Sequence, residues 1–326
     1  MIIVISEPND VHAQAVLGEL AKHRVSAKLL DLSEFPLKAS LLMRLSRDTP
    51  GRFGMRLADG STIDMEDVTA VWWRRPQAFG LPHQGMDPMA RHFALVELAT
   101  AFQGMWQASR ALWVNDIVRD AAAAHKPWQL ELAQSLGLSI PETVITNDPG
   151  EARAFWQRYP GGVIYKPFLQ SFHSWRETRI LRPEEERHAD QIRLAPVIFQ
   201  RYVPARSDLR LTVIGEEIFA AEAAMDQSQY PVDVRLNNIP YQPHQLPDEV
   251  GGKVLALMQR LGLEYGAIDF RLTPDGDYVF LEINPAGQFL YVEHATGLPI
   301  SAALATHLAR GVASSAGNPQ QALRVA

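Results

Sequence analysis

A polar pair interrupts an apolar, strand-like segment in the C-terminal part of the chain. In YVFLEINPAGQF, Glu282 and Asn284 lie one residue apart, so on a strand their side chains point to the same side. The sequence predicts a hairpin turn at Asp275-Gly276. A tight turn there would place Asp269 opposite Glu282, and a four-residue loop would leave Asp269 on the same face. A three-residue loop with a bulge would break the arrangement.

The chemistry that fits this arrangement is the binding of a divalent cation. Two facing carboxylates repel each other unless a positive charge lies between them. Side-chain oxygens suit a hard cation, so Asp269, Glu282 and Asn284 are candidate ligands for Mg²⁺. The alternative is a solvent-facing polar stripe on an ordinary hairpin.

Cationic residues near the ends of predicted elements form a second group. Lys126 stands at the mouth of a predicted helix, and Lys166 ends the apolar strand VIYK, where burial of an ammonium group without an anion is unfavourable. Taken alone, each lysine is better explained as a structural residue whose ammonium group reaches water. Arg210 and Arg235 occur in DLRLTVI and VDVRLNN. Beside a magnesium site, they indicate a place for phosphate and for developing negative charge.

Composition limits the class of protein. The chain has 326 residues, of which 47% are hydrophobic, which is enough for two or three small domains. A net charge of −6 gives no support to binding of nucleic acid or of an acidic membrane surface. No apolar run approaches the roughly 20 residues of a membrane helix. The absence of cysteine excludes disulfides and thiolate metal sites and is consistent with a cytoplasmic protein.

Hydrophobic periodicity predicts an α/β opening followed by a mixed α+β region. The first strand, IIVIS, is not followed by a glycine-rich loop, so a dinucleotide fingerprint is absent, and it is read as a buried strand rather than a signal peptide. The charged stretch 174–193 fits a strand, a hairpin or a short helix. The expected helices are 11–22, 88–110, 127–136, 148–158, 247–261 and 300–310, and the expected strands include 27–30, a hairpin at Asp59-Gly60, a strand ending at Trp73, LWVND, GGVIYKPF and antiparallel strands about Gly215.

Taken in chain order, these pieces resemble the ATP-grasp superfamily, which binds ATP between two α+β lobes. The order is Lys126, Lys166, the hinge strand VIFQRYV, DLR, Asp269 and LEINPAG. Within the superfamily, the chain is similar to the microviridin-type ligases, the graspetide synthetases, in AVWWRRP, HKPWQLELAQSLGL, LTVIGEEIF, YGAIDF and VFLEINPAGQF. The likeness covers most of the chain. It implies an ATP-grasp fold with an N-terminal α/β pre-ATP-grasp domain at 1–115, a central lobe at 116–196, a C-terminal lobe at 197–312 and a flexible tail at 313–326.

The resemblance also implies a role for each candidate on the phosphate side of the site. Lys126 and Lys166 would hold the α- and β-phosphates of ATP. The three metal candidates would hold one or two Mg²⁺ ions that bridge the phosphates. Arg210 and Arg235 would face the γ-phosphate and an acyl phosphate.

On the adenosine side, Asp208 is the candidate for the ribose hydroxyls. The hinge would hold adenine largely through backbone groups, and it comprises Gln200, Arg201, Tyr202 and Val203. Two departures from the family pattern stand out. Arg201 replaces a residue that is often acidic, and Arg271 follows the metal candidate Asp269 by two positions, where it would touch either phosphate or an acidic substrate side chain.

The activity that the resemblance implies is ATP-dependent ligation. A carboxylate of an Asp or Glu side chain in a precursor peptide would become an acyl phosphate, and a Ser/Thr hydroxyl or Lys amine would then close a macrolactone or macrolactam. The alternatives are an ATP-grasp ligase for free amino acids or small peptides, a nucleotide-binding regulator and a kinase. The WWRRP segment favours the peptide ligase, and the intact Lys, Lys, Asp and Glu-x-Asn set argues against a regulator.

The expected partner is a precursor peptide with a leader segment. Arg74 and Arg75 follow two tryptophans at a strand end and would either receive acidic side chains of the peptide or lie solvated beside a buried Trp. Residues 176–187 would grip the leader or form a solvated hairpin. The apolar, Trp-rich first domain makes a homodimer plausible. Ester or amide formation, ring pattern and leader-binding residues do not follow from the sequence.

Overall fold

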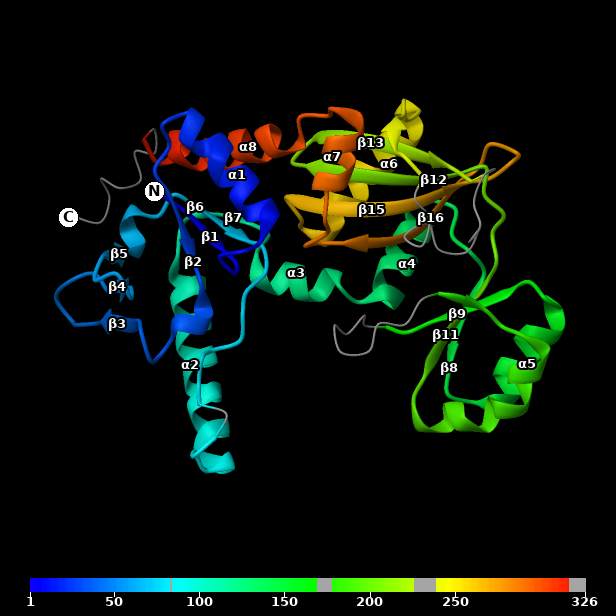
Figure 1. Cartoon of the computed structure of the whole chain (residues 1–326), viewed down its shortest axis with the longest axis horizontal. Helices are drawn as coiled ribbons and strands as arrows, with labels where there is room; N and C mark the ends of the chain where they lie inside the picture. The colour runs from blue at the N-terminus through cyan, green and yellow to red at the C-terminus, as the bar shows by residue number, and fades with distance from the viewer. Residues whose placement is uncertain (83, 169–177, 226–238, 317–326) are drawn as a thin grey trace. The chain divides into compact units, whose positions relative to one another are not determined.

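The computed structural model describes residues 1–82, 84–168, 178–225 and 239–316, with side chains described up to residue 311 (Figure 1). The chain divides into two compact units, Met1–Ile117 with Pro299–Ala326 and Val118–Leu298. The first boundary lies near the expected end of the N-terminal domain at 115. The finer division into a central lobe, a C-terminal lobe and a tail stays a prediction.

The first unit is built on a parallel sheet with the strand order β2-β1-β6-β7. Strand β1 is apolar throughout and fully buried, as expected for a parallel strand covered on both faces. On one face lies the helix that carries Phe102 and Trp106, and on the other lies a C-terminal helix in which a Cβ at Gly311 would come within 2.5 Å of the Thr69 carbonyl oxygen. The elements are β1 (Ile2–Ile5), α1 (Val11–Lys22), β2 (Ala27–Leu30), β6 (Ala70–Trp73), α2 (Pro88–Ala108), β7 (Leu112–Val114) and α8 (Ile300–Ala316).

A small antiparallel sheet, β3-β4-β5, completes this unit. Gly60 has a φ of 81° in the turn between β4 and β5, which confirms the predicted hairpin at Asp59-Gly60. The elements are η1 (Leu32–Glu34), β3 (Ser40–Arg44), β4 (Arg52–Arg56), β5 (Thr62–Asp64) and η2 (Met65–Asp67).

The second unit contains a four-stranded antiparallel sheet, here called the β9–β11 sheet, with the order β10-β9-β11-β8. Phe199 and Trp156 pack edge to face on the side covered by α5. Because side chains alternate along a strand, Gln200 and Lys166 lie on the opposite side of the sheet. The elements are β8 (Thr143–Thr146), α5 (Pro149–Arg158), β9 (Val163–Lys166), β10 (Arg179–Ile180), the 3₁₀ segment η3 (Pro183–Leu194) and β11 (Val197–Arg201).

The larger sheet of this unit, the β12–β16 sheet, has five strands in the order β14-β13-β12-β15-β16. One of its faces is apolar and packs against α4 and α6 through residues such as Leu211, Ile268 and Leu257. The other face carries the charged candidates. The elements are α3 (Ile117–Ala123), α4 (Lys126–Ser135), β12 (Ser207–Ile214), β13 (Glu217–Ala224), β14 (Gln242–Pro243), α6 (Asp248–Leu261), β15 (Tyr265–Leu272), β16 (Tyr278–Asn284) and α7 (Leu290–Thr296).

Most predicted elements are confirmed, and the differences concern ends and short helices. Helix α8 continues to Ala316, beyond the expected end at Arg310, so the first residues of the expected tail are helical. The short helices α3 and α7 were not predicted. Residues 174–177 of the charged stretch lie outside the described part of the chain, and the rest contains β10 and most of η3. Every helix in the described ranges is too short or too polar to span a bilayer.

Candidate active site

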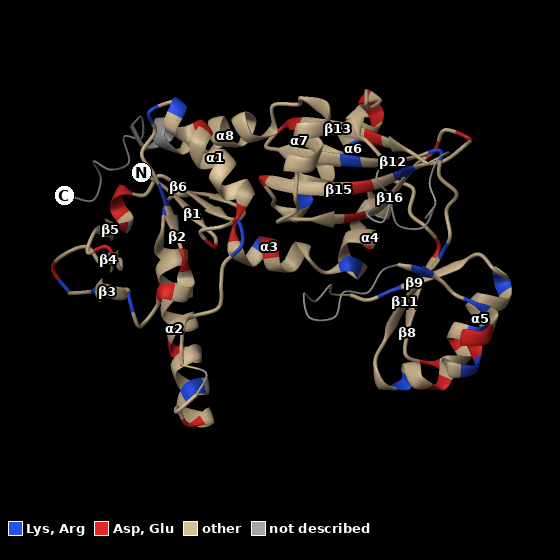
Figure 2. Ribbon diagram, in the orientation of Figure 1, with Lys and Arg blue, Asp and Glu red and all other residues tan. Residues whose placement is uncertain are grey.

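The charged face of the β12–β16 sheet is a row of cross-strand pairs. Asp208 and Arg210 of β12 lie opposite Arg271 and Asp269 of β15, and Asp269 in turn lies opposite Glu282 of β16. Figure 2 shows this pattern as basic positions on β12 beside acidic positions on β15 and β16. Acid and base therefore alternate across the sheet, except where the two carboxylates meet.

The predicted pairing of Asp269 with Glu282 is confirmed, although the two strands are not joined by a tight turn. The loop between β15 and β16 spans residues 273–277, and the register shifts by one residue between Asp269 and Phe270. This shift makes Leu281 the extra residue of a β-bulge. The bulge compensates for the longer loop, so that Asp269, Glu282 and Asn284 share one face.

Three cationic side chains converge on these carboxylates. The ammonium group of Lys126 forms an ion pair with Glu282, and that of Lys166 lies 3.9 Å from the same Glu282 oxygen. Arg210 donates a hydrogen bond of 2.8 Å to Asp269 and one of 3.0 Å to the Gln288 carbonyl oxygen. The row thus gathers lysines from α4 and β9, which are far apart in the sequence, at the carboxylates of the hairpin.

The electrostatics of the row favour an additional positive charge. Burial raises the pKa of Asp269, the charge of Arg210 opposes this rise, and the nearby Glu282 and Asp208 add to it. Burial alone would lower the pKa of Arg210, but the charge and hydrogen bond of Asp269, together with the nearby Tyr291 and Tyr265, outweigh burial and raise it. Asp269 is therefore a carboxylate whose ionised form is only partly compensated by the protein.

The donor set fits Mg²⁺. The described ranges hold no cluster of three His, Cys, Asp or Glu side chains suited to a metal. A divalent ion between Asp269 and Glu282 would therefore complete its shell with the Asn284 oxygen, water or phosphate oxygens, as Mg²⁺ characteristically does. Asn284 already accepts a 3.0 Å hydrogen bond from the Ala286 amide, which holds its side chain.

On the β9–β11 sheet, Gln200 fits recognition of adenine. Its side chain is fully buried and donates to the Thr143 hydroxyl at 3.0 Å. Its Oε1 atom is buried and has no hydrogen-bond partner within the described ranges. An acceptor of this kind is unfavourable to leave unpaired and suits an amino-group donor such as that of adenine. The Arg201 guanidinium instead stacks over Tyr159, 5.3 Å from the ring centre, on the other side of the strand.

The arginines predicted to contact substrate lie in different surroundings. Arg74 is buried and pairs with Asp10 at 3.0 Å, with Ser6 donating to the same carboxylate, so it is neither a solvated residue nor one presented to a peptide. Arg75 is only half-buried. Arg271 is buried against Asp208. Arg235 lies outside the described part of the chain.

Gln129 is a site residue that sequence reasoning missed. Its amide accepts a 3.0 Å hydrogen bond from the Ile283 amide and donates one of 2.8 Å to the Ile283 carbonyl, so it pairs with the free edge of β16 between Glu282 and Asn284. It lies three residues after Lys126 on α4, a spacing that puts both on one helix face. That spacing is the signal that could have found it.

Tyr241 and Tyr291 are two further neighbours of the row that were not predicted. Their rings pack at 5.3 Å. Burial raises the pKa of Tyr291, and the charge of Arg210 opposes this rise, which places its hydroxyl near the guanidinium. Tyr291 follows the LEINPAGQF segment closely, whereas nothing in the sequence marks Tyr241.

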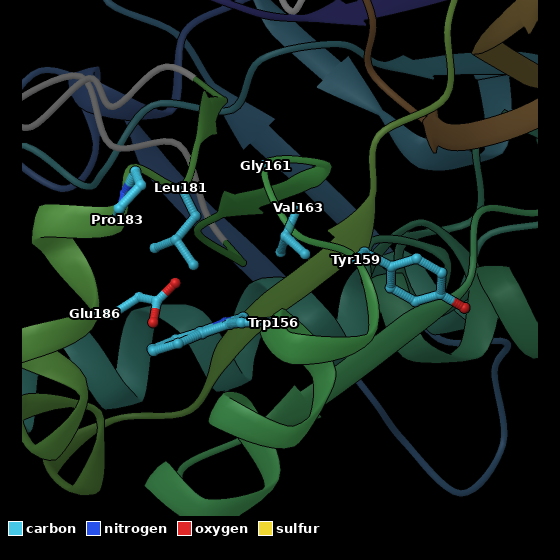
Figure 3. A pocket seen from close by; sticks show the side chains of 7 residues that line it. All are labelled: Trp156, Tyr159, Gly161, Val163, Leu181, Pro183 and Glu186. Atoms are coloured by element: carbon cyan, nitrogen blue, oxygen red, sulfur yellow. The ribbon is translucent and has the colours of Figure 1, made fainter.

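The cavity in Figure 3 is unrelated to the charged row. It holds about 20 Å³ and is lined by Trp156, Tyr159, Gly161, Val163, Leu181, Pro183 and Glu186. It lies on the α5 side of the β9–β11 sheet, away from Gln200 and Lys166. Its volume fits about one water molecule and is too small for a substrate.

Comparisons with known proteins agree with this geometry. The family model of the MvdD pre-ATP-grasp domain matches residues 1–121. The structure is similar to the macrocyclase MdnC from Microcystis aeruginosa MRC, bound with precursor peptide MdnA, at 30% identity over 95% of this chain and 100% of that chain, with a TM-score of 0.84. MdnB from the same organism gives 30% identity over 94% and 98% of the two chains with a TM-score of 0.81. A Chryseobacterium gregarium RiPP-associated ATP-grasp ligase, in complex with ADP, leader and core peptide, gives 25% identity over 95% and 96% with a TM-score of 0.84. A search of curated protein sequences found no match.

Lysines from two elements, paired carboxylates and a buried hinge strand are what an ATP-grasp ligase requires, and this protein is such an enzyme, one that forms ester or amide bonds. The N-terminal unit narrows the class, because residues 1–121 match the family model of the MvdD pre-ATP-grasp domain. The chain belongs to the microviridin-type peptide ligases, the graspetide synthetases.

Proposed function

We propose that the enzyme uses ATP and Mg²⁺ to activate Asp or Glu side chains of a ribosomal precursor peptide, and that it closes macrolactone or macrolactam rings with Ser/Thr or Lys. The observation that carries this proposal is the in-register pair of Asp269 and Glu282, flanked by Lys126, Lys166 and Arg210. A peptide substrate is supported by the similar macrocyclase MdnC, which is bound with a precursor peptide, and by the Chryseobacterium gregarium ligase, which holds leader and core peptides.

The reaction follows from the poor leaving group of a carboxylate. A carboxylate oxygen of the peptide attacks the γ-phosphorus of ATP, and ADP leaves. The hydroxyl or amine of the same peptide then attacks the acyl carbon, phosphate leaves, and the nucleophile loses its proton. Each ring removes the elements of one water from the peptide and converts one ATP to ADP and phosphate.

The phosphate side is assigned to the cations of the row. Lys126 and Lys166 would hold the α- and β-phosphates, since both ammonium groups already lie beside an anionic oxygen of Glu282. Arg210 would stabilise charge on the transferred phosphoryl group, and Arg235 is proposed to assist it. Mg²⁺, held by Asp269, Glu282 and Asn284, would supply charge neutralisation during transfer when bound.

The adenosine side is assigned to the hinge and to Asp208. The buried Gln200 oxygen would accept from the adenine amino group, and backbone groups of residues 201–203 would contact the ring. Asp208 would accept from ribose hydroxyls, because a carboxylate has about four acceptor positions and Arg271 occupies only part of them. On the substrate side, Arg75 remains a proposed peptide contact, whereas the buried pairings of Arg74 and Arg271 favour structural roles.

We also propose an oligomeric state and a location. A homodimer is supported by a row of exposed apolar side chains on α2, formed by Met89, Phe93 and Val96 at helical spacing. A cytoplasmic location is supported by the absence of cysteine. Size-exclusion chromatography with light scattering tests the homodimer, since a monomeric mass across concentrations would contradict it.

Mass spectrometry tests the activity. The enzyme, ATP, Mg²⁺ and a peptide with clustered Thr, Ser, Lys, Asp and Glu, encoded beside the enzyme's own gene, should give peptide that has lost one water per ring. An unchanged peptide mass together with ADP release stimulated by free amino acids would indicate a small-molecule ligase instead. A gain of phosphate without ring closure would indicate a kinase.

A further inference from the structure

Arg271 is a buried charge whose three nitrogens each donate a hydrogen bond. It lies opposite Asp208 in the β12–β15 register, and its Nε and Nη2 atoms donate to the two Asp208 oxygens at 2.7 and 3.0 Å. Such a fork of two parallel bonds fixes the plane of both groups. The same edge of the guanidinium would be needed to bind a phosphate or a substrate carboxylate, so the pairing argues against both roles that the sequence left open.

The remaining side of Arg271 faces the linker, defined as residues 202–206 between β11 and β12. Its Nη1 atom donates to the Val203 carbonyl oxygen at 3.0 Å, and its guanidinium lies over the Tyr202 ring, 5.6 Å from the centre. Donation to the Val203 carbonyl leaves the Val203 amide available to a ligand. Arg271 therefore touches the two linker residues that belong to the proposed hinge.

The linker is also held by backbone bonds on both sides. The Tyr202 amide donates to the Gly162 carbonyl at 2.7 Å, which ties it to the β9–β11 sheet. The Arg206 amide donates to the Leu272 carbonyl at 2.8 Å, directly after Arg271 on β15. Between these two ties, the side chain of Arg271 restrains the position of Val203 through its hydrogen bond to the Val203 carbonyl oxygen.

We propose that Arg271 is a positioning residue for the nucleotide, which holds the Tyr202–Val203 hinge and the Asp208 carboxylate in a fixed relation. The adenine and ribose groups of one ATP molecule are recognised by segments on different strands, and one guanidinium bonds to both. Because Arg271 holds these groups in place before ATP binds, it lowers the conformational-entropy cost of nucleotide binding. This inference rests on the proposed use of ATP and gives Arg271 no contact with the peptide.

Arginine is required for this role because lysine presents a single point charge. Lysine cannot donate two parallel bonds to Asp208 while also reaching Val203 and stacking on Tyr202. Arg271→Lys keeps the buried charge beside Asp208 and so preserves the ion pair needed for folding. The variant therefore separates charge compensation from positioning.

The test measures ADP affinity by calorimetry, and KM for ATP and for the precursor peptide, in wild type, Arg271→Lys and Arg271→Met. Arg260→Met, at an exposed arginine on α6 of the same unit, is the matched control. Both Arg271 variants should raise the Kd for ADP and the KM for ATP by about tenfold to about a hundredfold, the loss expected for charge-assisted hydrogen bonds. The KM for peptide should stay within about twofold, and Arg260→Met should match wild type.

A double-mutant cycle with Asp208 distinguishes positioning by Arg271 from a general structural effect. In an Asp208→Asn background, Arg271→Lys should weaken ADP binding less than it does in the wild type, because the two side chains act as one unit. Fully additive losses, an unchanged ADP affinity in folded Arg271→Lys, or a rise confined to the peptide KM would each overturn the inference. Failure of wild-type protein to bind ADP would instead refute the proposed function, so the two failures are distinguishable.

Discussion

Two arginine–aspartate pairs, one in each unit of the chain, differ in how completely they are shielded from solvent. The side chains of Arg74 and Asp10, in the first unit, are 0% and 2% exposed. The side chains of Arg210 and Asp269, in the second unit, are 9% and 36% exposed, and Glu282 lies opposite the same aspartate. The first pair is a closed ion pair, whereas the second leaves a carboxylate open on one side and only partly compensated.

The pKa values of the two aspartates follow this difference. Burial acts to raise the pKa of Asp10, but the charge of Arg74 and the hydrogen bonds from Ser6 and His12 outweigh burial and lower it. The pKa of Asp269 is raised by burial and by Glu282 despite Arg210. The same two residue types thus form a closed ion pair in one place and the proposed ligand-binding site in the other, depending on what else lies beside the carboxylate.

The largest expected effect is loss of turnover in Glu282→Gln. This change removes one of two facing carboxylates and the ion pairs with both lysines while keeping side-chain volume. ADP formation in the presence of peptide should fall by at least about a thousandfold. Glu249→Gln, at an exposed glutamate paired with Lys253 on α6, is the matched control and should retain wild-type turnover. Measurable ring closure by Glu282→Gln would contradict the metal assignment.

The closed Arg74–Asp10 pair should instead affect the free energy of unfolding. Asp10→Asn keeps a residue that caps α1 but removes the carboxylate charge that faces the buried Arg74. Urea unfolding should show a loss of about 3–5 kcal/mol. KM for ATP in the folded fraction should be unchanged. A stable Asp10→Asn protein with a raised KM for ATP would show that this pair belongs to the site after all.

Gln129→Met tests whether the edge of β16 needs its side-chain partner. The variant keeps length but removes both bonds to Ile283, so the backbone between Glu282 and Asn284 loses its hydrogen bonds to α4. We expect kcat to fall by about tenfold to about a hundredfold, with a smaller change in KM for peptide. Gln134→Met, on the same helix at an exposed position, is the control. An unchanged kcat would show that β16 holds its register alone.

The smallest expected effect is on the pH dependence of stability. The lowered pKa of Asp10 contributes stability that is present above its ordinary value of 3.8 and is lost as pH falls through the folded value. The raised pKa of Asp269 has the opposite sign, since stability is lost as pH rises from 3.8 through the folded value. Asp269→Asn should therefore be slightly more stable than wild type at neutral pH, although inactive. Thermal melts at pH 3 to 7 check both signs, and a destabilised Asp269→Asn at neutral pH would contradict the second.

Alternation along strands predicted much of this site, and its limits are physical. The shared face of Glu282 and Asn284, and the polar face of Asp208 and Arg210, follow from the period of two. The bulge at Leu281 and the partner of Arg271 did not follow, because they depend on loop length and on register between strands far apart in the chain. Helix α1 was predicted with approximately the observed bounds because its amphipathic pattern is local in the sequence.

Burial of charge was the least predictable feature. Arg74 follows a buried strand, and nothing near it in the sequence shows that Asp10, on another element, would enclose it. The convergence of Lys126 and Glu282 was predicted only through family resemblance, because they are separated by 156 positions. Local patterns specify which side of a strand a residue occupies, whereas tertiary packing decides which charges meet.

A crystal structure with ADP and Mn²⁺ in place of Mg²⁺ tests the central claim most directly, because the anomalous signal of Mn²⁺ locates the ion. One or two peaks should lie within about 2.3 Å of oxygens from Asp269, Glu282 and Asn284, beside the diphosphate and the ammonium groups of Lys126 and Lys166. Peaks elsewhere, or a nucleotide bound away from these side chains, would contradict carboxylate activation at this row.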